Sequence, residues 1–65
     1  MPIEITGPCE LLDWILESGQ VPGAQRREAR GLIWIIAPEI SPEAERIATV
    51  TGCKVHHIHF APTPL

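Results

Sequence analysis

Alternating and continuous apolar positions predict one central strand near the middle of the chain. From Arg30 the sequence reads RGLIWIIAPEISPEAERIATVTGCKVHHIHF, with an unbroken apolar run at residues 32–37. Successive strand residues point to opposite faces of a sheet. One face would carry Leu32, Trp34 and Ile36, and the other Ile33, Ile35 and Ala37. Since both faces are then apolar, residues 32–37 should lie inside a sheet rather than at its edge.

The residues after this strand predict a helix and a returning strand. Ser41 suits an N-cap, Pro42 suits the first helical position, and Gly52 suits a left-handed C-terminal stop. The weakly apolar stripe of this helix consists of Ala44, Ile47, Ala48 and Thr51. Residues 53–60, CKVHHIHF, are rich in β-branched and aromatic side chains and would form the next strand.

The first part of the chain predicts a short strand at residues 2–6 and a helix that begins near Pro8 and ends at Ser18-Gly19. Residues 20–29 then contain a turn signal, Val21-Pro22-Gly23, followed by AQRREAR. We interpret this segment as a connection with one or two exposed helical turns.

The expected fold is a single α/β domain over residues 1–65 with the order β-α-β-α-β, a three-stranded mainly parallel sheet and two helices. Right-handed crossovers between adjacent strands would place both helices on one face and leave the other bare. A second copy of the chain would cover that face, so the sequence predicts a homodimer with Trp34, Ile36 and Phe60 in its interface. Two alternatives stay open: the first strand in the middle, with one helix on each face, or pairing through the edge of the last strand.

Charge argues against a general binder of nucleic-acid backbones. Five Lys and Arg oppose eight Asp and Glu, which gives a net charge of −3. Arg26, Arg27 and Arg30 form the one basic cluster, and a solvated segment or a local anion or nucleic-acid contact would explain it. No apolar run is long enough for a membrane span and no signal peptide is expected. We therefore expect a cytoplasmic protein whose Cys9 and Cys53 are reduced thiols.

Three histidines near the end of the chain raise the possibility of a divalent metal site. On a strand His57 and His59 would share a face and could present two imidazoles to a metal ion, whereas His56 points the other way. Cys53 lies about 13 Å along the strand from His57 and could not complete the same site. Structural histidines at an edge or an oligomer interface are the competing interpretation.

No catalytic or cofactor-binding residues are expected. Ser41 and Cys9 are better explained by helix capping and packing, and the turn at residues 37–40 lacks the glycines of a phosphate-binding loop. The sequence therefore favours a small non-catalytic interaction or regulatory module that self-associates, with a partner protein as a further possibility. The alternative is a metal-binding protein that uses His57 and His59.

Several segments of the chain carry a resemblance to a known family. Residues 3–6, IEIT, resemble a strand with an E-x-K motif, and residues 9–17 resemble the helix after it. Residues 31–55 resemble the remaining strand, helix and strand. In this respect the chain is similar to the carboxyl-terminal half of the PD-(D/E)XK nuclease superfamily, particularly the RecB-like domain of NucS-type endonucleases.

The sequence departs from this family at the positions that matter for catalysis. Glu4 matches the motif glutamate, but Thr6 stands in place of the catalytic lysine, and the upstream hairpin with its metal-binding aspartate is absent. The reaction needs two carboxylates for a divalent ion and a lysine to position water. The resemblance thus implies a nuclease-like half-fold without activity, or a nuclease remnant that a partner chain completes by supplying the missing aspartate and lysine.

Overall fold

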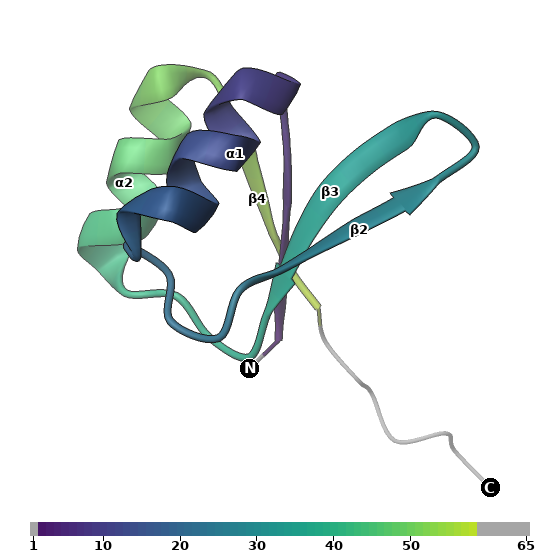
Figure 1. Ribbon diagram of the computed structural model, residues 1–65. Coiled ribbons are helices and arrows are strands. Elements are labelled where there is room, and N and C mark those ends of the chain that lie inside the picture. Colours follow the sequence, from purple (N-terminus) through teal and green to yellow (C-terminus); the bar gives the residue numbers. More distant parts are fainter. Residues whose placement is uncertain (1, 59–65) are drawn as a thin grey trace, which may run out of the picture.

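A computed structural model of the chain describes residues 2–58 and contains two helices and four strands (Figure 1). In chain order the elements are β1 (Ile3–Thr6), α1 (Cys9–Ser18), β2 (Gln25–Ala29), β3 (Leu32–Ala37), α2 (Pro42–Thr51) and β4 (Lys54–His57). The α/β class and the two helices agree with the sequence-based prediction.

The four strands form one sheet in the order β2-β3-β1-β4, and every pair of neighbours is antiparallel. As a result β1 and β2 run in the same direction with β3 between them, while β3 and β4 run in the same direction with β1 between them. Helix α1 connects the first of these pairs and α2 connects the second. The chain therefore consists of two interleaved split βαβ units, the arrangement known as ferredoxin-like.

The prediction of a three-stranded mainly parallel sheet was wrong, because residues 25–29 form a strand and not a helical connection. All five residues of β2 are exposed, and pairing with β3 holds them in the strand conformation. Arg30 and Gly31, with φ of 53° and 78°, make the tight turn between the two strands. Tertiary pairing has here overridden the helix propensity of the QRREA sequence.

Local signals at α2 act as the sequence predicts. The hydroxyl of Ser41 accepts a hydrogen bond from the Ala44 N–H at 3.2 Å, and Pro42 occupies the first turn. Gly52 ends the helix with φ of 109°, and the Cys53 N–H donates to the Ala48 carbonyl at 2.9 Å. Local signals therefore define both ends of α2, and β4 begins two residues after Gly52.

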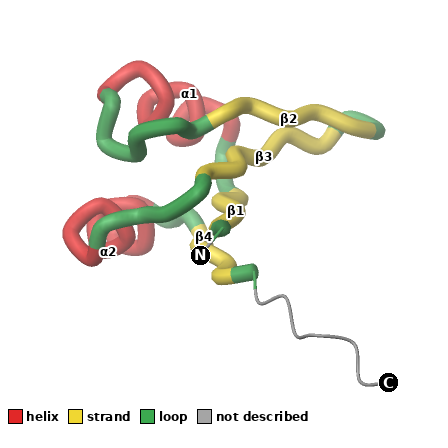
Figure 2. Tube along the Cα trace, turned by 90° about the horizontal axis from the view of Figure 1, so that it is seen from below, coloured by secondary structure: helices red, strands yellow, loops and turns green. Residues whose placement is uncertain are grey.

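Both helices lie on one face of the sheet, and the core lies between them and that face (Figure 2). The buried side chains are Ile3, Ile5, Leu12, Ile15, Val21, Ile35, Ala37, Ala44, Ala48 and Cys53. All strand members of this set follow the alternation of their strands. The bare sheet face expected from the sequence is therefore present, although antiparallel strands and not parallel ones produce it.

Candidate functional site

The face of the sheet turned away from the helices is the candidate site, and we call it the open face (Figure 2). Its residues are Glu4 and Thr6 of β1, Gln25, Arg27 and Ala29 of β2, Leu32, Trp34 and Ile36 of β3, and Lys54 and His56 of β4. Their positions follow from strand alternation, since Ile3, Ile5, Ile35 and Ala37 are buried on the helix side.

The strand register arranges these residues in rows. The Glu4 row runs across the sheet as Gln25, Ile36, Glu4 and His56. One step along the strands, the Thr6 row runs as Arg27, Trp34, Thr6 and Lys54. Neighbours within a row are about 4.8 Å apart and the rows about 6.8 Å apart. The open face is therefore a small grid with one apolar column and polar residues on both sides of it.

The apolar column belongs to β3. Leu32 is 69% exposed, and Trp34 and Ile36 are half-buried. A hollow of about 460 Å³ lies beside Trp34 and is also lined by Glu4 and Thr6. A second hollow, of about 310 Å³, continues the apolar surface past Ile36. Its remaining lining residues are Pro2, Ile3, Gly23, Gln25, Ala37, Pro38 and Ile58. The column is thus one continuous apolar surface rather than isolated side chains.

Two hydrogen bonds order the polar side chains beside this column. The Arg27 guanidinium donates to the Gln25 side-chain oxygen at 2.9 Å, which ties the two rows together on β2. On the other side, Thr6 Oγ1 and His56 Nε2 lie 3.3 Å apart. Of the eight acidic residues in the chain, Glu4 alone belongs to the open face. The face therefore has a basic bias that the net charge of the whole protein conceals.

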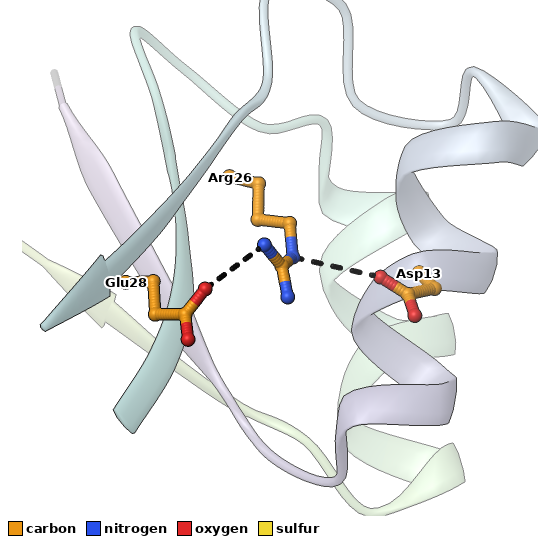
Figure 3. A network of polar contacts seen from close by, with 3 residues as sticks. All are labelled: Asp13, Arg26 and Glu28. Atoms are coloured by element: carbon orange, nitrogen blue, oxygen red, sulfur yellow. Dashed lines mark hydrogen bonds and ion pairs between the residues drawn. The ribbon is translucent and has the colours of Figure 1, made fainter. Parts of the chain in front are cut away.

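The three arginines predicted as one basic cluster point in different directions. Arg26 lies on the helix side, where its guanidinium is 3.9 Å from Asp13 of α1 and 3.3 Å from Glu28 (Figure 3). Arg27 lies on the open face and Arg30 in the turn between β2 and β3. Because consecutive strand residues face opposite ways, the segment does not present its cations together.

The predicted metal pair is described only in part. His57 lies at the helix-side rim of β4, where its Nε2 contacts a carboxylate oxygen of Glu45 on α2. His59 lies outside the described residues. Within residues 2–58 there is no cluster of three or more potential metal-ligating side chains. His57 and Glu45 together could supply two ligands of a metal site, and sequence reasoning had not paired them.

The predicted interface residues are also described only in part. Trp34 and Ile36 lie side by side on the open face, as expected from the alternation of the strand. Phe60 lies outside the described residues. Trp14 lies on α1, away from the open face, and is 42% exposed. Strand alternation therefore identified the apolar column, but the surrounding polar residues depend on a register that the sequence does not reveal.

Three reactive groups lie near one another on the open face, and two thiols lie elsewhere in the described chain. Thr6, His56 and Glu4 bring a hydroxyl, an imidazole and a carboxylate onto neighbouring strands, but no hydrogen bond within residues 2–58 joins Glu4 to His56. Cys9 is exposed and Cys53 is buried, and both thiols are free. Burial raises the pKa of the Cys53 thiol above its usual value of 9.0, and a hydrogen bond with Thr51 offsets part of that rise. Cys53 is therefore an inert core thiol.

Neither helix of the described chain has the length and apolar character needed to cross a membrane. Comparison of the sequence with family models and with curated proteins, and of the structure with solved structures, gives no significant match. The relationship to PD-(D/E)XK nucleases therefore stays a prediction.

Proposed function

We propose that this chain is a small non-catalytic interaction module that self-associates into a homodimer through the open face. The observation that carries the proposal is the uncovered apolar column of Leu32, Trp34 and Ile36 in the interior of the sheet. Apolar surface gains free energy when it leaves water, at about 25 cal/mol per Å². A second copy supplies a surface of the same shape and apolar character, so it can cover the column without any further component.

The size of the open face favours a reversible dimer. The strands contain 4, 5, 6 and 4 residues, and these 19 residues at about 3.3 Å each, on strands about 4.8 Å apart, give a footprint of roughly 300 Å². A stable complex of standard size buries about 800 Å² on each partner. The monomer also has its own core on the helix side. We therefore expect folded monomers in equilibrium with dimers, with a dissociation constant in the micromolar range, on the order of 10 to 100 µM.

Analytical ultracentrifugation of the untagged chain tests this proposal. Sedimentation velocity runs from about 1 to 200 µM span the expected dissociation constant. The weight-average sedimentation coefficient should rise from the monomer value toward that of a dimer across this range. A single monomeric species at every concentration, with circular dichroism showing a folded chain, would refute self-association.

A reducing compartment suits this module. Cys9 is an exposed free thiol, and Cys53 is free and buried. An exposed thiol on a self-associating protein would form intermolecular disulfides in an oxidising compartment. We infer that the protein works in the cytoplasm.

The contact between His57 and Glu45 favours divalent metal binding as a second candidate function. An imidazole and a carboxylate are ligands that Zn²⁺ accepts, and the metal site expected from the sequence also includes His57. Metal analysis of tag-free protein and melting curves with Zn²⁺ or Ni²⁺ test the idea. Binding should raise the melting temperature of the wild type but not of His57→Gln. Unchanged melting of the wild type with both metals would exclude it.

A nuclease remnant is the third candidate, and the accessible position of Glu4 on the open face supports it. A partner chain that supplied an aspartate and a lysine would have to approach this same face, since Thr6 stands at the lysine position. Incubation with branched and single-stranded DNA plus Mg²⁺ or Mn²⁺, with and without cell extract, tests for cleavage. DNA that stays intact under all of these conditions would exclude this candidate.

A further inference from the structure

The arrangement of the open face points to one particular dimer, in which the two-fold axis lies between the two sheets and runs across the strands. We infer that β3 of one copy lies over β3 of the second copy in the opposite direction. This inference rests on the proposed self-association and specifies its geometry. It follows from the two residue rows, because each symmetry operation brings a different set of residues into contact.

A two-fold axis parallel to the strands gives poor contacts. It reverses the strand order, so that β2 lies over β4 of the second copy and β3 lies over β1. Arg27 would then face Lys54 of the second copy, which places like charges together at both rims. Ile36 would face Glu4 of the second copy, which takes a carboxylate out of water against an apolar side chain. Both contacts are unfavourable.

A two-fold axis across the strands, midway between the rows, exchanges the Glu4 row with the Thr6 row. Each strand then lies over the same strand of the second copy. Trp34 then lies over Ile36 of the second copy, so the apolar columns meet each other. At the end of the column, Leu32 approaches Pro38 of the second copy, which lines the second hollow. The whole apolar column is covered in this arrangement, and no cation is placed against it.

The polar residues also match across this axis. Thr6 faces Glu4 of the second copy, so its hydroxyl can donate to a carboxylate. Arg27 faces Gln25 of the second copy. Lys54 faces His56 and is a diagonal neighbour of Glu4 on the second copy. Each open-face carboxylate therefore gains a donor, and each cation stays at the rim where water reaches it.

Substitutions of opposite charge at Thr6 test the axis. With the axis across the strands, residue 6 faces Glu4 of the second copy, twice per dimer. Thr6→Lys should therefore tighten the dimer and Thr6→Glu should weaken it, each by about 3- to 30-fold for two ion pairs of partly exposed type. The double variant Glu4→Lys/Thr6→Glu again places opposite charges at these two positions, so it should bind more tightly than the wild type and resemble Thr6→Lys.

The alternative axis predicts a different pattern, since residue 6 would then face Trp34 of the second copy. Both charged substitutions would weaken the dimer alike, and the double variant would bind less tightly than the wild type, which would overturn the inferred axis while leaving self-association intact. A monomeric wild type at about 200 µM would instead overturn the proposed function together with the axis. Melting curves on dilute protein verify that each variant is folded, and the double variant provides the test if Thr6→Glu alone does not fold. A wild type that stays monomeric but binds single-stranded DNA through this face would also overturn the inference.

Discussion

Replacing Leu32 with lysine should weaken the dimer strongly and leave the monomer almost unchanged. Complete burial of a leucine side chain stabilises by about 1.5–3 kcal/mol. Leu32 is 69% exposed in the monomer, so its burial in a dimer contributes about 1–2 kcal/mol per copy, or about 2–4 kcal/mol for two copies. At 1.4 kcal/mol per factor of ten, the dissociation constant should rise roughly 30- to 700-fold.

The matched control is Val50→Lys. Val50 is 79% exposed on α2, in the helix layer behind the sheet, so the substitution introduces the same charge away from the open face (Figure 2). Sedimentation equilibrium gives the dissociation constants of the three proteins, and urea denaturation at low concentration gives the stability of each monomer. Both variants should unfold within about 0.5 kcal/mol of the wild type. Equal dissociation constants for the two variants, or an unchanged constant for Leu32→Lys, would contradict the role of the open face.

Three further predictions concern the monomer and use urea denaturation. A Cβ on Gly7 would lie 2.9 Å from the Cys53 sulfur and 3.2 Å from the Cys53 Cα. Gly7→Ala should therefore destabilise the fold by about 1–3 kcal/mol. A smaller loss would show that the chain around Cys53 can move to make room for the added methyl group. Ser41→Ala removes the cap of α2 and should cost about 1 kcal/mol, whereas Ser41→Asp should retain most of the stability; equal losses would contradict a capping role. Burial raises the pKa of Cys53, so the unfolded chain loses the thiol proton first and stability should be full below pH 9.0 and decrease as the pH rises above it. Cys53→Ala should lessen this decrease, and the same pH profile in both proteins would exclude the thiol as its source.

Local signals were sufficient to predict some elements of the fold. Residues 41–52 contain their own cap, first-turn proline and terminating glycine, so α2 depends little on the rest of the chain. The run at residues 32–37 is apolar enough to require an interior position in a sheet, and β3 has one. These features need only nearby residues, and the sequence displays them directly.

Residues 25–29 show why the sheet type could not be predicted. QRREA has no apolar face, and its strand conformation comes from the partner strand rather than from its own side chains. One additional strand before β3 reverses the direction in which β3 runs, which converts an expected parallel neighbour of β1 into an antiparallel one. A single unrecognised strand therefore changed the direction of every later strand relative to β1.

The apolar part of the candidate site could be predicted from the sequence, but its polar neighbours could not. Alternation placed Trp34 and Ile36 on one face, and the helices were expected to leave one face bare. The sequence did not show that Gln25 and Glu4 flank this column, because cross-strand register depends on how distant segments align. Nor did periodicity connect His57 with Glu45, since that contact depends on how α2 lies against β4.

The central position of β1 has a consequence for synthesis of the protein. Both neighbours of β1 come later in the chain, and one of them, β4, comprises Lys54–His57. A nascent chain therefore carries Ile3 and Ile5 without their full complement of strand partners until residue 57 has emerged from the ribosome. The strands β2, β3 and β1 can pair once residue 37 has emerged, but β1 stays open along its other edge until β4 pairs with it, so this edge of the native sheet is completed last.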